Sequence, residues 1–585
     1  MKKLWLFLVI LGLAVSVAHA AAPTLWVTAE IRGLQSFAEQ VERLAADFDA
    51  PMTQADFLGM IGGVLMAPAL DGIDKNGTIR IYVMEPAAGA PGGAPRVAFS
   101  LPVEGDGQVY LDSVASLLTP GEKSGDVEVY SAAPGTPAMI QKLCVVRLEN
   151  RLLLAQDEDT ASTVAGALKA GELPGQDMAV SGTLALSVAG RTNADRLEPL
   201  LNGLPMPPPT ANNPADPGRV MKAQFGGMLA LLRQVENLMI GLRANEISVT
   251  LSSLVEPVAG SVLERVMGEL RAPSAAFSAL VPANALAASA GCVAVPDEFL
   301  DAYAGIAEEM YSALGDPWTG LSKALRETVE QMKGQFLGEY AFAVVPGNGL
   351  LGMDFIQAFA VKDPAAMQAA MQKMVEAMQE IKVTEGQPLG MKLSVGEPRE
   401  YDGVSVTTYK YEVDIPAEAE QEIPAPVKDL FKNMQYEMAF VGQTMLYCLG
   451  SPESMNRLID SARAGEGASI QQAAPVRALL PDLPKAAVDI HYIRIMDLVR
   501  TAMNAVPELP ADVLQKLPAA SVTLAGYSVA QGRDLASFVR LSHTDLKELG
   551  AFFRSIAPAK PPQAGSMAID VDESMQMEEE AAPGD

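Results

Sequence analysis

The sequence predicts an α+β protein built from two similar halves in tandem, each with a largely antiparallel sheet covered by helices. Two observations lead to this fold class. Segments with alternating β-branched residues, which are typical of strands, occur in close pairs separated by single segments with helical apolar spacing. The same order of strands and helices then occurs twice along the chain. Closely spaced strands favour antiparallel pairing, because a parallel connection needs a crossover of about a dozen residues or more.

The first copy of this order spans residues 77–166. A two-residue turn, Glu149-Asn150, joins its last two strands, and the polar segment Asp157–Asp159 suits the N-terminus of its closing helix. We expect two strands, a helix, three strands and a helix in segments 77–83, 95–103, 107–118, 126–132, 142–148, 151–156 and 157–168.

The second copy spans residues 338–463 and keeps the order of elements. Gly442-Gln443 takes the place of the two-residue turn, and Ser451–Glu453 takes the place of the polar segment before the closing helix. The corresponding segments are 338–345, 354–362, 364–381, 403–413, 436–442, 444–450 and 451–462.

The flanking segments extend the match. A strand and a helix precede each copy, and a further strand and helix follow it. The tetrapeptide Ser248–Leu251 (SVTL) also recurs at Ser521–Leu524. Because a shared order over such a length is the signature of an internal repeat, we place the two halves at residues 21–272 and 273–560.

The two ends of the chain read as separate segments. Lys2 and Lys3, the apolar run Leu4–Val17 and Ala18-His19-Ala20 form the three parts of a secretory signal peptide, so we expect residues 1–20 to be cleaved after Ala20 and the chain to be exported. The tail 561–585 lacks aromatic residues and has a glutamate run, which predicts an acidic, disordered segment.

Three segments inside the halves predict loops. Residues 204–218 (LPMPPPTANNPADPG) are rich in proline and indicate an extended loop in the first half. Residues 86–95 predict a Gly/Ala/Pro hairpin loop, and residues 415–427 predict an acidic loop that contains proline.

The formal charge of −28 on 585 residues disfavours nucleic acid as a partner, because the chain has no basic cluster to offset repulsion from phosphates. The three cysteines, Cys144, Cys292 and Cys448, each lie in an apolar, strand-like run. We interpret them as buried thiols, although an oxidising compartment would permit one disulfide bond between two of them. Scattered cysteines and histidines give no spacing for a metal site, and the chain has no phosphate-binding loop, so we expect no cofactor.

Two short motifs resemble functional sites and are better explained by local structure. Asp74–Ile79 (DKNGTI) looks like half of a calcium loop, but Gly72 and Val83 occupy positions where carboxylate ligands are needed, so it predicts a turn before a strand. Gly526–Ala530 (GYSVA) resembles a serine-hydrolase elbow without its final glycine, and the next residues predict a turn into another strand. We interpret His491 and His543 as structural.

Methionines form one face of the predicted helix at 364–381. We prefer to interpret this stripe as the core face of a helix packed on a sheet, since the spacing is that of any buried helix face. The alternatives are a soft apolar-ligand face or, less well supported, a Cu(I) site. The candidate residues are Met367, Met371, Met374 and Met378.

The signal peptide, the segment Leu280–Ala283 (LVPA) that opens the second half, and the segment Leu70–Asp74 (LDGID) before a strand carry a family resemblance. On these features the chain resembles large exported bacterial proteins of unknown function that are built from duplicated strand-pair-plus-helix modules. The resemblance implies an exported location and a duplicated α+β fold. It supplies no activity and no functional residues.

Three functions follow as hypotheses. The first is an exported, non-catalytic envelope protein that binds or scaffolds another macromolecule of unknown identity. The second is a periplasmic carrier or chaperone for apolar ligands, and the third is a hydrolase with an unrecognised site. We rank the two binding functions above the enzyme, because no reactive constellation is visible in the sequence.

Overall fold

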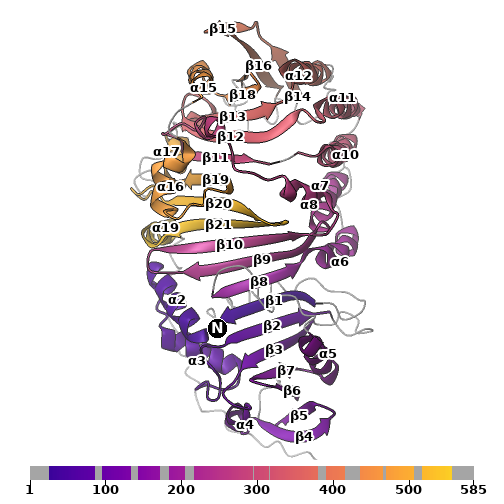
Figure 1. Ribbon diagram of the computed structural model, residues 1–585, viewed down its shortest axis with the longest axis vertical. Helices are drawn as coiled ribbons and strands as arrows, with labels where there is room; N and C mark the ends of the chain where they lie inside the picture. Colours follow the sequence, from indigo (N-terminus) through magenta and orange to yellow (C-terminus); the bar gives the residue numbers. More distant parts are fainter. Residues whose placement is uncertain are drawn as a thin grey trace, which may run out of the picture.

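The computed structural model describes residues 25–85, 95–133, 142–170, 183–203, 217–293, 295–314, 316–379, 390–414, 435–465, 469–505 and 517–556. In these residues 21 strands form a single sheet, and every strand pairing is antiparallel. The strands run across the elongated molecule and are stacked along its long axis (Figure 1).

The strands fall into two sets along the chain. Those of the first set are β1 (Leu25–Arg32), β2 (Thr78–Met84), β3 (Arg96–Pro102), β4 (Leu118–Ser124), β5 (Val127–Ala132), β6 (Lys142–Leu148), β7 (Arg151–Ala155), β8 (Leu184–Ala189), β9 (Val235–Ala244) and β10 (Ser248–Pro257). Those of the second set are β11 (Ala287–Cys292), β12 (Phe336–Pro346), β13 (Met353–Val361), β14 (Gly390–Val395), β15 (Arg399–Tyr401), β16 (Val404–Asp414), β17 (Gln435–Val441), β18 (Thr444–Leu449), β19 (Ala487–Arg494), β20 (Thr523–Gln531) and β21 (Asp534–Ser542).

Helices lie along both long sides of the sheet (Figure 1). They are α2 (Leu34–Asp47), α3 (Gln54–Val64), α4 (Gln108–Val114), α5 (Glu158–Ala170), α6 (Gly190–Gly203), α7 (Pro217–Leu232), α8 (Val262–Gly268), α9 (Ala275–Ser278), α10 (Asp297–Leu314), α11 (Asp316–Met332), α12 (Pro364–Gln379), α15 (Pro452–Ala464), α16 (Ala474–Leu479), α17 (Ile495–Asn504) and α19 (His543–Ile556). None of these described helices is long and apolar enough to cross a membrane.

The pair β10–β21 lies near the middle of the sheet. Outward from β10 the strand order is β9-β8-β1-β2-β3-β7-β6-β5-β4. Outward from β21 the order is β20-β19-β11-β12-β13-β18-β17-β16, and both β14 and β15 pair with β16.

The predicted mixed fold with an antiparallel sheet is confirmed. Both two-residue turns lie where expected, between β6 and β7 and between β17 and β18. The sequence did not indicate that the strands would join into one sheet. They join where β10 pairs with β21, from Ser248 opposite Ser542 to Val255 opposite Leu535. Hydrophobic alternation identifies a strand and its buried face, but not which strand edges meet.

One sequence match is wrong as evidence for a repeat. Ser248–Leu251 begins β10, whereas Ser521–Leu524 leads into β20. In the outward strand order β20 holds the place of β9, next to the central pair, so the two tetrapeptides do not occupy corresponding strands.

The proposed helix caps follow the expected chemistry. Ser451 accepts a hydrogen bond from the backbone N–H of Ser454 at the start of α15, and Asp157 accepts one from the N–H of Thr160 at the start of α5, at 2.7 Å. Each satisfies a backbone donor that the first turn of a helix leaves without an internal partner.

Both faces of the sheet carry buried cores. On β13, Ile356 and Ala358 belong to one apolar cluster, whereas Val361 belongs to another. Because successive side chains of a strand point to opposite faces, these clusters lie on opposite sides of the sheet. We call the side of Ala358 the alanine face; α9, α15 and α16 cover it. Helix α12 packs on the opposite side, with Val361.

Several predicted segments lie outside the described residues: the signal peptide, the loop at 415–427 and the tail at 561–585. Most of the predicted loops at 86–95 and 204–218 also lie outside them. The last two residues of the second loop, Pro217 and Gly218, begin helix α7 and are therefore not loop residues. Proline is accepted there because the first helical position has no internal hydrogen bond to lose.

Candidate ligand-binding site

A pocket of about 310 Å³ opens on the alanine face of the sheet, between α15, strands β12 and β13, and the segment that precedes β11. This volume is at the lower end of the range for small-molecule sites. We call it the α15 pocket; its lining is Leu280, Pro282, Asn284, Val345, Ile356, Ser454, Arg457, Leu458, Asp460 and Ser461.

One wall comes from the segment before β11. The short helix α9 begins at Ser274, whose hydroxyl accepts the backbone N–H of Phe277. After this turn Leu280 is buried in the core while Asn284 is exposed. The tetrapeptide Leu280–Ala283 therefore supplies two lining residues, Leu280 and Pro282.

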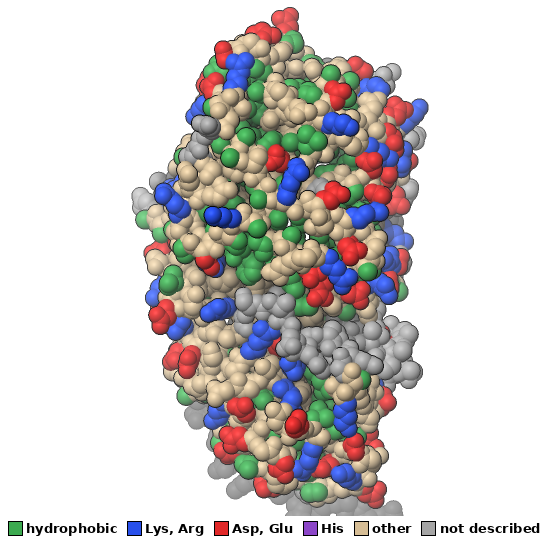
Figure 2. Space-filling view, in the orientation of Figure 1, with side chains coloured by type: hydrophobic (Ala, Val, Ile, Leu, Met, Phe, Trp, Pro, Cys, Tyr) green, Lys and Arg blue, Asp and Glu red, His purple; other side chains and the backbone are tan. Residues whose placement is uncertain are grey.

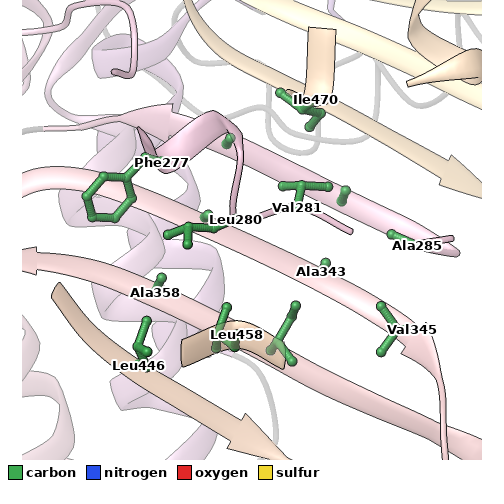
Figure 3. Close-up of a cluster of buried hydrophobic side chains, with 14 of the residues drawn as sticks. Phe277, Leu280, Val281, Ala285, Ala343, Val345, Ala358, Leu446, Leu458 and Ile470 are labelled. Atoms are coloured by element: carbon green, nitrogen blue, oxygen red, sulfur yellow. The ribbon is translucent and has the colours of Figure 1, made fainter. Parts of the chain in front are cut away.

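On the sheet the pocket is lined by Val345 of β12 and Ile356 of β13, and small side chains lie beside them. Ala341 and Ala343 on β12 and Ala358 on β13 are each at most 4% exposed and share the alanine face. We call these three residues the alanine floor. Larger residues here would fill the space beneath α15, because protein cores pack with few voids. In Figure 3, Ala343 and Ala358 lie on the strands between Leu280 on one side and Leu458 on the other.

At this floor the pocket closes. A crevice of about 140 Å³ continues between the alanine floor, Leu280 and Leu458, but it admits no water-sized sphere. The inner end of the α15 pocket is therefore apolar and shallow.

The other wall is one face of α15. Ser454, Arg457, Leu458 and Ser461 are spaced by three and four residues, so they lie on the same side of the helix. Leu458 is 3% exposed and reaches the core, whereas Arg457 is exposed. This wall thus becomes more polar from the floor to the mouth.

A buried carboxylate fixes the start of α15. Asp354 is 0% exposed, and its oxygens accept hydrogen bonds from the hydroxyls of Ser451 and Ser454 at 2.5 and 2.6 Å and from the backbone N–H of Gly349 at 2.8 Å. These donors replace the water that an ionised carboxylate loses on burial.

Glycines make room for this carboxylate. A Cβ added at Gly450, whose φ is +153°, would lie 2.2 Å from a carboxylate oxygen of Asp354, and one at Gly347 would lie 2.2 Å from its carboxyl carbon. Either substitution would push Asp354 out of its hydrogen bonds. The neighbouring thiol of Cys448 is also affected: burial, with Asp354 and Glu437 nearby, raises its pKa to about 12.

The hydrogen bonds continue from Asp354 to the mouth of the pocket. The hydroxyl of Ser454 donates a hydrogen bond to Asp354 and accepts one from Nη2 of Arg457 at 2.8 Å. Asp460, one turn further along α15, accepts the hydroxyl of Tyr401 at 3.0 Å. That hydrogen bond raises the pKa of Tyr401.

A second polar cluster lies on the opposite side of the sheet. Asp489 accepts hydrogen bonds from Ser289 and Tyr340, both at 2.8 Å, and its other oxygen lies 2.7 Å from Nδ1 of His491. Ser289 stands between Ala288 and Ala290 on β11, which places it opposite the alanine face. Burial raises the pKa of Asp489, but its hydrogen-bond donors, His491 first, outweigh burial and hold this pKa below the usual value.

The methionines that were considered as an alternative apolar-ligand face lie away from the α15 pocket. Met367 is 0% exposed, and Met371 and Met378 pack against the same cluster between α12 and the sheet. Met374 packs against the cluster between α10 and α11. This side of β13 is opposite the alanine face, so the methionine face and the pocket are separate.

The remaining candidate motifs form local structure. Asp74 accepts the backbone N–H groups of Asn76 and Gly77 in a turn before β2. Gly526 and Ser528 lie in β20, which continues through a tight turn into β21, as predicted. The three cysteines are buried and free. In the described part of the chain, no group of three or more His, Cys, Asp or Glu side chains is placed to hold a metal ion.

Comparison with known proteins supplies no identity: no family model matches the chain, and neither the curated proteins nor the solved structures contain a significant match.

Sequence reasoning did not find the α15 pocket, because its walls come from three segments far apart in the chain. Two signals were present. The strands β12 and β13 carry alanine at alternate positions, and glycines flank Asp354 and the start of α15. Only the pairing of the strands brings these alanines and glycines close together.

Proposed function

We propose that the protein is an exported, non-catalytic carrier that binds a small ligand with an apolar part in the α15 pocket. The observation that carries this proposal is the pocket itself: an apolar floor, a volume sufficient for a small molecule, and polar groups gathered at its mouth. The pocket favours the carrier hypothesis over the scaffold hypothesis.

Export belongs to the same proposal. It is supported by Lys2 and Lys3, the apolar run Leu4–Val17 and the Ala18-His19-Ala20 site.

On the face drawn in Figure 2, acidic and basic side chains are interspersed over the surface.

We also infer that the chain arose by tandem duplication, with the halves meeting at β10 and β21. Support comes from the strand orders on the two sides of this pair, which agree strand by strand: β1 corresponds to β11, β7 to β18 and β9 to β20. The helices follow the same rule, since α2 and α3 connect β1 to β2 as α10 and α11 connect β11 to β12. In Figure 1 these two helix pairs lie on opposite long sides, as expected for a twofold relation between the halves.

The hydrolase hypothesis has its best candidate at Asp489 and His491. An activated serine donates its hydroxyl proton to the histidine of such a pair. Here Ser289 donates to Asp489 instead. The cluster is better explained as a set of hydrogen bonds that satisfies a buried carboxylate.

The carrier proposal is tested with delipidated full-length protein and an apolar fluorescent dye. We expect saturable binding of the dye. Ser461→Leu, which adds apolar volume inside the pocket, should abolish binding, whereas Ala464→Leu, at the exposed end of the same helix, should leave it unchanged. Unsaturable binding, or equal binding by both variants, would refute the carrier.

A further inference from the structure

We propose that the α15 pocket selects a short amphipathic carboxylate, with its carboxylate on the guanidinium of Arg457 and its apolar part on Val345 and Ile356. This inference rests on the proposed function and adds the chemical class of the ligand. It is drawn from the orientation of Arg457, the depth of the pocket and the charges around its mouth.

Arg457 is held in place by the buried network. The hydroxyl of Ser454 donates its hydrogen bond to Asp354. Its oxygen can therefore accept a hydrogen bond from Nη2 of Arg457. A guanidinium has five N–H donors in a planar fork, and such a fork matches the two oxygens of a carboxylate. Fixing the side chain before the ligand arrives reduces the entropy lost on binding.

The acidic groups near the mouth already have donors. Asp460 accepts the hydroxyl of Tyr401 through both of its oxygens, at 3.0 and 3.2 Å. Asp354 lies beneath Ser454 with three hydrogen-bond donors and is 0% exposed. Arg457 therefore presents the cation to a ligand at the mouth, and Asn284 and Ser461 add neutral polar groups.

The depth of the pocket limits the length of the ligand. A volume of about 310 Å³ holds roughly ten non-hydrogen atoms if each takes about the volume of a water molecule. The crevice beyond it is closed by the alanine floor, Leu280 and Leu458. A short chain fits this space, whereas a long acyl chain would extend into solvent.

The test compares octanoate with 1-octanol, which has the same chain without the charge, by calorimetry at pH 7 and low salt. We expect wild-type protein to bind octanoate about tenfold more tightly than octanol, as one charge-assisted contact predicts. Arg457→Gln should remove this preference and keep octanol binding, which shows that the pocket is intact. Arg463→Gln is the matched control, because Arg463 lies on α15, pairs with Asp402 and does not line the pocket.

Two results overturn the inference and are distinguishable from each other. If wild-type protein binds octanol as tightly as octanoate, or Arg457→Gln keeps the preference, the carboxylate assignment is wrong while the carrier survives. If neither probe binds, the carrier proposal fails as well.

Discussion

At the residue scale, two carboxylates, Asp354 and Asp489, each collect hydrogen-bond donors from other parts of the chain. Asp354 draws on Ser451, Ser454 and Gly349, and Asp489 draws on Ser289, Tyr340 and His491. Partners from distant segments, such as Ser454 for Asp354 and Ser289 for Asp489, could not be inferred from sequence spacing, because the pairing of strands brings them together. The sequence showed that Asp489 and His491 are neighbours in a strand. It did not show that Ser289 and Tyr340 also contact Asp489.

Asp489 should make stability depend on pH. Its folded-state pKa is lowered, so the stabilisation is present above the ordinary aspartate value near 4 and is lost as the pH falls through the folded pKa. We expect Asp489→Asn to lower the free energy of unfolding by about 1–3 kcal/mol at pH 7. Urea denaturation at pH 7 and pH 3 measures this loss.

The difference in the free energy of unfolding between wild type and Asp489→Asn should shrink at pH 3, because the stabilisation by the carboxylate declines once the pH falls below the ordinary aspartate value. Glu400→Gln, at an exposed position on β15, is the control and should change little at either pH. An equal loss of stability at both values would show that the carboxylate charge of Asp489 contributes nothing.

At the scale of elements, strands and helices with clear periodicity were predicted well, and elements that depend on partners were not. Strand β4 has a polar sequence and exposed residues from Thr119 to Ser124, and it forms by pairing with β5. Helix α7 begins inside a proline-rich segment, at Pro217. In both elements, tertiary context decides a structure that local composition opposes.

Helix α19 is fastened to the first half of the chain by His543. Its Nδ1 contacts Oδ2 of Asp47 at 2.5 Å, and its Nε2 contacts the backbone oxygen of Asn245 at 2.6 Å. His543 and Asp47 are 12% and 4% exposed. Further along α19, Arg554 donates to the backbone oxygen of Phe48 at the end of α2. The contacts of His543 with Asp47 and of Arg554 with Phe48 join residues 496 and 506 positions apart.

Replacing His543 should therefore loosen this contact between the two ends of the chain. We expect His543→Ala to speed amide hydrogen exchange in α19 and at the end of α2 by about tenfold, the effect of losing one to two buried hydrogen bonds. Lys547→Ala is the control, because its ammonium lies 3.7 Å from Asp47 and is 63% exposed. Uniform faster exchange throughout the sheet would instead indicate global destabilisation.

At the scale of the whole molecule, one sheet is joined through β10 and β21, and a small core of Ala185, Met239, Leu254 and Ala536 spans this junction. The order of strands and helices was readable in the sequence, since each element has its own hydrophobic period. The joining of all these strands into one sheet was not readable, because the edges of β10 and β21 carry no distinguishing pattern. The α15 pocket is assembled within the second set of strands, from segments between residue 280 and residue 461.

A crystal structure of the full chain grown with octanoate tests the central claim most directly. The account predicts one antiparallel sheet with a ligand between α15 and the side chains of Val345 and Ile356, its carboxylate within hydrogen-bond distance of Arg457. An empty α15 pocket in crystals of protein saturated with octanoate, or octanoate bound with its carboxylate away from Arg457, would contradict it.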